Sequence, residues 1–208
     1  MIIAVDGPLA SGKGTIARAL SERFSLPHLD TGTLYRATGL AVLDAGADPS
    51  NAQACADLAR NLDLDAIDET RIRTAEAGAM ASKVAAIPQV REALFALQRA
   101  FATQPGGAIL DGRDIGTVIC PDAEVKLFVT ADAETRARRR WEELTAKGER
   151  LSFEDMLAQT HERDRRDAGR PDAPMRPADD ATLLDTSSLS IDAAVATAIR
   201  IVEKRQKA

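Results

Sequence analysis

The sequence predicts an α/β fold in which helices cover both faces of a parallel β-sheet. Three observations support this prediction. Short apolar runs alternate with longer segments of helical periodicity along the 208 residues. A glycine-rich loop joins the first apolar run to the first helical segment, and charged residues follow the later apolar runs. Because ligands of open parallel sheets bind at the carboxyl ends of the strands, these loops are the candidate site.

Five segments are expected to form strands, and the length of the chain suits one core domain. The segment Ile2-Ile3-Ala4-Val5 is a continuous apolar run, as a strand buried on both faces requires. Residues 108–110 and 125–129 have the same character, whereas 27–29 and 182–184 are shorter.

The segments between these strands have helical periodicity and capping residues. Asn51, Asp132 and Ser152 are good N-caps, and Pro88 is well placed in a first helical turn. The expected helices cover residues 12–24, 33–44, 51–62, 73–86, 88–103 and 190–204, and two more begin near Asp132 and Ser152.

Composition argues against several classes of protein. A net charge of −5 is unfavourable for a general binder of nucleic acid or of membrane surfaces. Eleven of the 27 Lys and Arg residues nevertheless lie between Arg136 and Arg176, which favours a compact anionic ligand.

Cys55 and Cys120 match no metal or redox spacing and are expected to be free thiols, with a lone disulfide as the alternative. Without a targeting segment or an apolar run long enough to span a membrane, the chain is expected to be cytoplasmic.

The loop after the first strand fits the G-x-x-x-x-G-K part of the phosphate-binding P-loop. Glycines let the backbone wrap a phosphate, and the N-terminus of the following helix faces the anion. Lys13 is expected to bridge the β- and γ-phosphates of ATP. Gly14 stands where the general motif has Ser or Thr, so the motif assigns no direct Mg²⁺ ligand, and Thr15 is a candidate for contact through water. The expected ATP-binding residues are Gly7, Pro8, Leu9, Ala10, Ser11, Gly12, Lys13, Gly14 and Thr15.

A second anion-binding site is expected where the segment from Asp30 to Arg36 begins a helix. A nucleotide kinase holds two anions close together, so it needs cations at the acceptor as well as at the transferred group. Arg36, one turn into this helix, is expected to hold the acceptor phosphate. The alternative is a helix capped by Thr33 with Arg36 on its surface.

The segment Leu110-Asp111-Gly112-Arg113-Asp114 follows the third expected strand. Asp111 is a candidate for Mg²⁺ contact through water, since Mg²⁺ prefers carboxylate oxygens and keeps several waters. Gly112 is expected to let Arg113 and Asp114 project into the cleft. Simple turn chemistry is the alternative.

A basic segment runs from His161 to Asp167 and on to Arg170. In a helix, Arg165 points away, and one face carries Arg163, Arg166, Asp167 and Arg170. Gly169 and the prolines at 171, 174 and 177 suggest a hinged lid that closes over ATP, excludes water and neutralises the transition state. The alternative is a solvated charged helix.

Together these segments resemble the bacterial cytidylate kinases, and the resemblance covers nearly the whole chain. The P-loop alone says little about the acceptor, whereas the last two segments combined are far more specific to the family. The segments that carry the resemblance are residues 7–15, 30–36, Ile72-Arg73-Thr74, 111–118, and Glu162 to Asp167 with Arg170.

The resemblance implies a three-layer P-loop fold with a five-stranded parallel sheet. It also implies a nucleoside-monophosphate-binding subdomain over about 31–103 and a lid over about 148–177. The core would then comprise about 1–30, 104–135 and 178–208.

The resemblance also assigns roles to single residues. Lys13, Arg113, Arg166 and Arg170 would be catalytic. Arg73 and Asp114 would read the cytosine edge, where a carboxylate suits the exocyclic amine of cytosine and not the oxygen of uracil. The residues expected to bind the acceptor are Thr31, Tyr35, Arg36, Arg73, Arg113, Asp114, Arg163, Asp167 and Arg170.

The implied activity is ATP- and Mg²⁺-dependent phosphorylation of CMP and dCMP by in-line transfer. A monomer is expected, with small-molecule substrates and neither a nucleic-acid polymer nor a membrane as partner. The rivals are a P-loop kinase for another acceptor, such as UMP, AMP or a small metabolite, and a non-enzymatic nucleotide switch. The sequence contains no Asn-Lys-x-Asp guanine-reading motif, which argues against the switch.

One departure from the family concerns the base pocket. The family usually carries a small β-sheet insert with a base-contacting serine before Ile-Arg-Thr. Here eight residues separate Leu64 from Arg73, and no Ser lies between Asn51 and Ala81. Thr70 or Thr74 could substitute, and the sequence does not choose between them.

Overall fold

The structure, a computed structural model, describes residues 1–63 and 66–206. Two compact units are distinguished by their internal contacts, one made of Met1–Leu29 with Phe101–Ala208 and the other of Asp30–Ala100. Leu64, which borders the shortened segment, lies outside the described residues.

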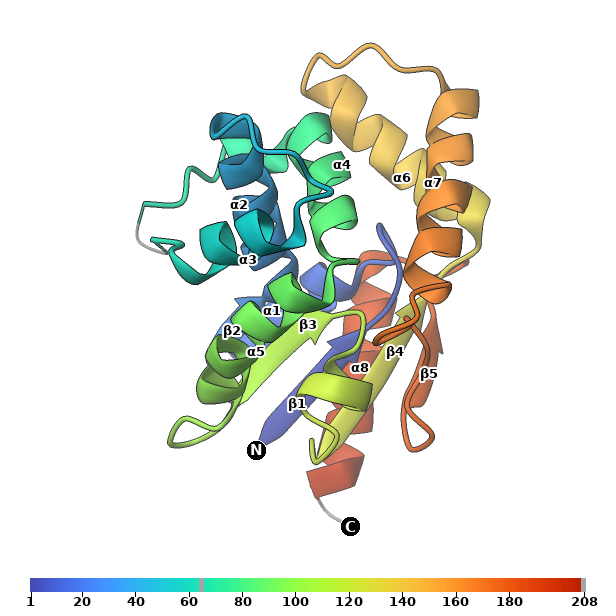
Figure 1. The fold of residues 1–208 in the computed structure, drawn as a ribbon. Coiled ribbons are helices and arrows are strands. Elements are labelled where there is room, and N and C mark those ends of the chain that lie inside the picture. The colour runs from blue at the N-terminus through green and yellow to red at the C-terminus, as the bar shows by residue number, and fades with distance from the viewer. Residues whose placement is uncertain (64–65, 207–208) are drawn as a thin grey trace. The chain divides into compact units, whose positions relative to one another are not determined.

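The predicted five-stranded parallel sheet is confirmed (Figure 1). Its strand order is β2-β3-β1-β4-β5. The first strand therefore lies at the centre, as expected for a strand that is apolar on both faces. The strands are β1 (Ile2–Asp6), β2 (His28–Asp30), β3 (Ala108–Gly112), β4 (Val125–Thr130) and β5 (Thr182–Asp185).

Every predicted helix is present, with shifted ends. The helices are α1 (Lys13–Phe24), α2 (Thr31–Asp44), α3 (Ala52–Arg60), α4 (Ala75–Val84), α5 (Pro88–Ala102), α6 (Ala133–Ala146), α7 (Phe153–Ala168) and α8 (Ile191–Gln206). A short 3-10 helix covers Arg71–Arg73, and a π-helical turn that the sequence did not predict covers Ile115–Ile119.

Two helix starts differ from the prediction because of capping side chains. The side chain of Asp30 accepts a hydrogen bond from the N–H of Gly32 at 2.9 Å, so α2 begins before Thr33 and that residue is not its cap. Thr74 caps α4 in the same way by accepting from the N–H of Ala77 at 3.2 Å. The helix expected from Arg73 therefore begins after Thr74.

Two apolar layers enclose the sheet because alternate residues of its strands face opposite sides. Ile3 and Val5 belong to the layer that α1 and α8 cover, where Leu20 and Val202 are buried. Ala4 and Leu110 belong to the opposite layer, which includes the π-helical turn and the end of α5. The sheet thus holds the loops at its carboxyl edge on a rigid support.

Helices α6 and α7 pack against one another as a hairpin with a small core of its own. Trp141 and Phe153 meet edge to face, with ring centroids 6.3 Å apart. The indole N–H of Trp141 donates to the carbonyl of Leu151 at 2.8 Å, in the connection between the helices. This packing places the arginine-rich face of α6 beside the charged segment of α7.

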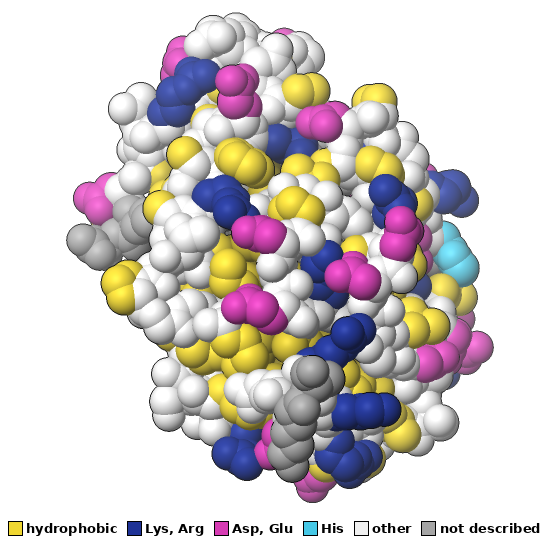
Figure 2. Space-filling model, turned by 90° about the horizontal axis from the view of Figure 1, so that it is seen from below, with side chains coloured by type: hydrophobic (Ala, Val, Ile, Leu, Met, Phe, Trp, Pro, Cys, Tyr) yellow, Lys and Arg dark blue, Asp and Glu magenta, His cyan; other side chains and the backbone are white. Residues whose placement is uncertain are grey.

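Charged side chains of both signs lie on the face drawn in Figure 2, where hydrophobic side chains are also exposed. Among the described residues, no helix combines the length and the hydropathy that crossing a membrane requires.

Candidate phosphate-binding site

The loop between β1 and α1 has the predicted strand–loop–helix geometry. Gly7 has a φ of 150°, and a Cβ there would lie 1.9 Å from the carbonyl oxygen of Val129, so only glycine fits. Ala10 and Gly12 adopt left-handed conformations, with φ values of 60° and 91°. Gly12 precedes α1 and provides no side-chain cap, which leaves the N–H groups of the first helical turn for an anion.

Two arginines of α6 donate hydrogen bonds to backbone carbonyls of this loop. Nη1 of Arg136 lies 3.4 Å from the carbonyl oxygen of Leu9, and Nη1 of Arg139 lies 3.5 Å from that of Ala10. Arg136 also forms a bidentate pair with Asp164 of α7, at 3.0 and 2.6 Å. The α6–α7 hairpin and the loop are therefore tied together through one guanidinium group.

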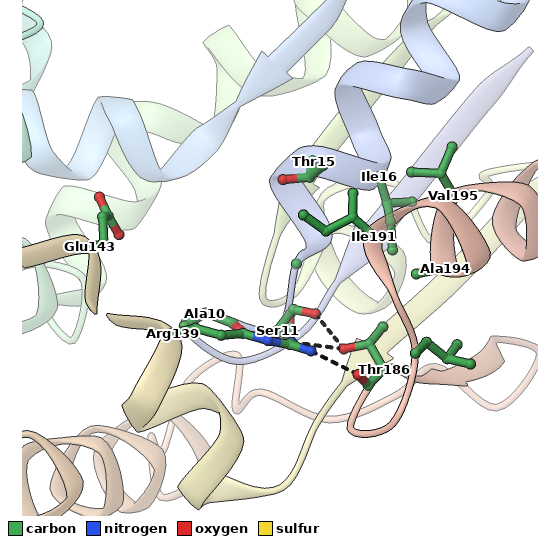
Figure 3. Close-up of a pocket in the computed structure, with 12 residues that line it drawn as sticks. Ala10, Ser11, Thr15, Ile16, Arg139, Glu143, Thr186, Ile191, Ala194 and Val195 are labelled. Carbon is green, nitrogen blue, oxygen red and sulfur yellow. Dashed lines mark hydrogen bonds between the residues drawn. The ribbon is translucent and has the colours of Figure 1, made fainter. Parts of the chain in front are cut away.

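Thr186, just after β5, completes this support (Figure 3). Its hydroxyl donates to the carbonyl of Ser11 at 2.9 Å, and Arg139 donates to the Thr186 hydroxyl at 3.1 Å and carbonyl at 2.8 Å. Ser11 is fully buried. These hydrogen bonds hold the backbone of the loop at Ser11 to the end of β5 and to α6.

A pocket of about 270 Å³ opens beside the loop (Figure 3). One wall is apolar and comes from α1 and α8, and the other carries polar groups from α6 and from the end of β5. The shape and chemistry suit a flat, partly polar ring next to the phosphate-binding loop. The lining residues are Ala10, Ser11, Gly12, Thr15, Ile16, Arg139, Glu143, Thr186, Leu189, Ile191, Ala194 and Val195.

Asp111 lies inside β3, because the strand continues two residues beyond its expected end at residue 110. The side chain is buried, and its Oδ1 lies 2.7 Å from Nε2 of His28. Its Oδ2 lies towards the loop, since a Cβ built on Gly14 would be 3.9 Å away. Asp111 thus binds β2 through His28 and lies near the first turn of α1.

The donor set fits Mg²⁺ held mainly by phosphates and water. Among residues 1–63 and 66–206, no cluster of three His, Cys, Asp or Glu side chains could hold a metal ion. Mg²⁺ at a nucleotide needs only one or two protein oxygens besides phosphate and water. Asp111 and Thr15 supply oxygens of that kind near the loop.

Asp6 is a second buried carboxylate at this edge of the sheet, and it is the last residue of β1. Its oxygens accept hydrogen bonds from the N–H groups of Ile115 and Gly116, at 2.8 and 2.7 Å. Burial raises the pKa of Asp6 to about 7, and the negative charge of Asp114 adds to this, against the two N–H groups and Lys13.

Arg113, Arg163 and Arg170 converge on Asp167, which is only 1% exposed. Nε of Arg113 and Nη2 of Arg170 donate to different oxygens of this carboxylate. Nε of Arg163 lies 3.9 Å from it. The structure thus brings into contact two segments that are far apart along the chain, 111–118 and 162–170.

The charge balance of this cluster is positive, with three guanidinium groups around one carboxylate. Burial alone would raise the pKa of Asp167, but Arg113, Arg170 and Arg163 outweigh it and hold the pKa below its ordinary value. The carboxylate therefore stays ionised and keeps the arginines together.

The two other arginines of α7 differ from this cluster. Arg165 is exposed and pairs with Glu162 at 2.7 Å, so the prediction that it points away is confirmed. Arg166 is one-third exposed and lies 3.4 Å from the same carboxylate. The helix ends at Ala168, so Arg170 reaches Asp167 from just beyond the helix.

In the unit Asp30–Ala100, three candidate residues lie along α2. Thr31 is buried in the first turn, and the hydroxyl of Tyr35 lies 3.4 Å from Nη1 of Arg91. Arg36 donates to the carbonyl of Ile72 at 3.0 Å. The same helix therefore presents a hydroxyl, a phenol and a guanidinium group.

The position of Arg36 depends on a glycine of α4. A Cβ built on Gly78 would lie 3.0 Å from Nη1 of Arg36 and 3.4 Å from Nη2. Since side chains rarely approach so closely, the missing Cβ leaves room for the guanidinium group.

Arg73, by contrast, lies on the surface in the 3-10 helix. Its side chain is 59% exposed and pairs with Glu69 at 2.8 Å. The hydroxyl of Thr74 donates to the carbonyl of Arg71 at 3.0 Å besides capping α4, so its proton is already engaged.

Sequence reasoning missed Arg136, Arg139, Thr186 and Asp6. The arginines of α6 entered the prediction only through the count of basic residues between Arg136 and Arg176. Their spacing of three residues in the helix after β4 was the available signal, since it puts both on one face. Asp6 could have been singled out as the charged end of an otherwise apolar strand.

Comparison with known proteins agrees with this geometry. The profile of the cytidylate kinase family matches residues 3–204. A cytidylate kinase of Cereibacter sphaeroides is 59% identical over 98% of this chain and 96% of its own length. One of Methylocella silvestris is 56% identical over 98% and 94%. A crystal structure of an uncharacterized protein from Eubacterium ventriosum is similar in fold, with a TM-score of 0.58, 15% identity and 98% coverage of both chains.

Proposed function

This chain belongs to the cytidylate kinase family, and we propose that it transfers the γ-phosphoryl group of ATP to CMP and dCMP. The convergence of Arg113, Arg163 and Arg170 on Asp167 carries this proposal. A site that only binds ATP does not require a second concentration of arginines beside the P-loop, whereas transfer between two phosphate groups does.

ATP binds through its phosphates and through its base. The N–H groups of the loop and of the first turn of α1 hold the β- and γ-phosphates, and Lys13 bridges them as a point charge. The adenine ring occupies the pocket beside the loop, against Arg139 and the apolar side chains of α1 and α8. Asp111 and Thr15 would hold Mg²⁺ through water, and the ion would supply positive charge at the phosphates.

CMP binds through phosphate, base and sugar. Thr31, Tyr35 and Arg36 of α2 line its site, with Arg36 on the phosphate. Asp114 and Arg73 read the edge of the cytosine base. Arg73 must therefore leave Glu69, a surface pair that is worth less than about 1 kcal/mol.

Residues of α7 complete the site. Arg163 and Asp167 hold the sugar, while Arg113, Arg166 and Arg170 bind the phosphates. We further propose that about 31–103 forms the nucleoside-monophosphate-binding subdomain and that about 148–177 closes as a lid.

Transfer is in line and forms no covalent enzyme intermediate. A phosphate oxygen of CMP attacks the γ-phosphorus of ATP, and the bond to the bridging oxygen breaks to give ADP and CDP. The arginines and Lys13 stabilise the charge on the equatorial oxygens, and closure of the lid keeps water out. We propose a cytoplasmic monomer acting on small molecules.

A coupled assay of ADP formation with CMP, dCMP, UMP and AMP tests this function. We expect CMP and dCMP to give the highest kcat/KM, because the amine of cytosine donates to Asp114 and uracil presents an acceptor there. A clear preference for UMP or AMP, or no acceptor-dependent ADP, would contradict the proposal.

A further inference from the structure

Asp6 is a buried carboxylate to which phosphoryl transfer assigns no role. It is 4% exposed and directly precedes Gly7, the first residue of the phosphate-binding loop. Burying a carboxylate is costly unless its oxygens are hydrogen-bonded, so the contacts of Asp6 indicate what it does.

Both oxygens of Asp6 bind the start of the π-helical turn. Oδ1 accepts from the N–H of Ile115 at 2.8 Å, and Oδ2 accepts from the N–H of Gly116 at 2.7 Å. These two residues directly follow Asp114, which begins the turn.

The chain just before Asp114 is held by the first residue of the phosphate-binding loop. The N–H of Gly7 donates to the carbonyl of Gly112 at 3.2 Å. Consecutive residues of β1 and the loop, Asp6 and Gly7, therefore hold the chain on both sides of Arg113 and Asp114.

The chemistry of this contact requires a carboxylate. Two adjacent N–H groups need two acceptors, and the two oxygens of a carboxyl group present both. Asparagine at this position would place its NH₂ group against one of the two N–H donors. Gly116 leaves room for the arrangement, because a Cβ there would lie 3.3 Å from Oδ2 of Asp6.

We propose that Asp6 is a positioning residue that fixes the direction of Asp114 and thereby sets the selectivity for the acceptor base. The carboxyl group of Asp6 binds only the segment after Asp114, whereas the loop is held by the backbone contact of Gly7, so the effect should fall on the acceptor. This inference rests on the proposed function, in which Asp114 reads cytosine.

The test compares Asp6→Asn with the wild type in steady-state kinetics with CMP, UMP and ATP. We expect KM for CMP to rise about tenfold and KM for ATP to change by less than about twofold. The selectivity ratio, which is kcat/KM for CMP divided by kcat/KM for UMP, should fall because KM for CMP rises. Equal changes in both KM values, or an unchanged ratio, would overturn the inference and mark Asp6 as merely structural.

Glu124→Gln is the matched control. Oε2 of Glu124 also accepts a backbone N–H of β1, that of Ile2 at 2.6 Å, but at the opposite end of the strand. This variant should keep the wild-type ratio. A fall as large as that of Asp6→Asn would also overturn the inference.

If Asp6→Asn does not fold, Gly116→Ala decides, since its Cβ would lie 3.3 Å from Oδ2 of Asp6 and 3.2 Å from Cδ of Lys126 without changing any charge. A lower CMP-to-UMP ratio in this folded variant supports the inference, and an unchanged ratio overturns it. Wild-type enzyme without CMP-dependent ADP formation would instead refute the proposed function itself.

Discussion

Arg170 offers the sharpest test of the arginine cluster. Its side chain is 4% exposed and binds Asp167, which Arg113 also contacts. In Arg170→Ala the carboxylate keeps Arg113, so the loss of folding stability should stay near about 1–3 kcal/mol. An arginine that stabilises the transition state of phosphoryl transfer is worth about a thousandfold or more in kcat, or about 4 kcal/mol. The effect on turnover should therefore exceed the effect on stability.

The assay is initial-rate ADP formation at saturating ATP and CMP, with thermal unfolding followed in parallel. Arg165→Ala is the control, because Arg165 belongs to the same charged segment, is 72% exposed and pairs with Glu162. That variant should keep nearly all of its turnover. A folded Arg170→Ala variant with near-normal kcat would refute the role of Arg170 in transfer.

Three further predictions follow from single contacts. Gly78→Ala should shift the guanidinium group of Arg36 and raise KM for CMP about tenfold with kcat nearly unchanged. An unchanged KM would contradict the dependence of acceptor binding on this position of Arg36. Asp167→Asn should cost about 3 kcal/mol of stability in urea unfolding, since it leaves buried guanidinium groups without their carboxylate; a cost below that of Asp164→Asn would contradict this. The folded state raises the pKa of Asp6 from 3.8 to about 7, so Asp6 contributes stability that is present below pH 4 and lost as the pH rises through 7. The stability of the wild type relative to Asp6→Asn should therefore fall by about 3 kcal/mol between pH 5 and pH 8, and a constant difference would refute the raised pKa.

Features set by local sequence were predicted correctly. The P-loop is such a feature, because its conformation follows from glycines placed between an apolar strand and a helix. The alternation of apolar runs and helical segments likewise indicated the parallel sheet. Two helix starts were misplaced because of capping side chains, those of Asp30 before α2 and Thr74 before α4.

Features set by tertiary contacts were not predictable from one sequence. The segment Ile115–Ile119 is rich in β-branched residues, which favour strands, yet it forms a π-helical turn. Its first N–H groups bind Asp6, a residue more than 100 positions earlier. The resemblance placed Arg113, Asp167 and Arg170 in one site, but their direct ion pairs could not be read from the residues, since they require α7 to pack beside the end of β3.

The central claim, direct transfer from ATP to CMP, is tested most directly by phosphorus NMR of the products. Purified protein incubated with Mg²⁺, CMP and ATP labelled in the γ-phosphoryl group should yield CDP that carries the label in its β-phosphate, together with unlabelled ADP. Release of the label as inorganic phosphate, or its transfer to UMP in preference to CMP, would contradict the account.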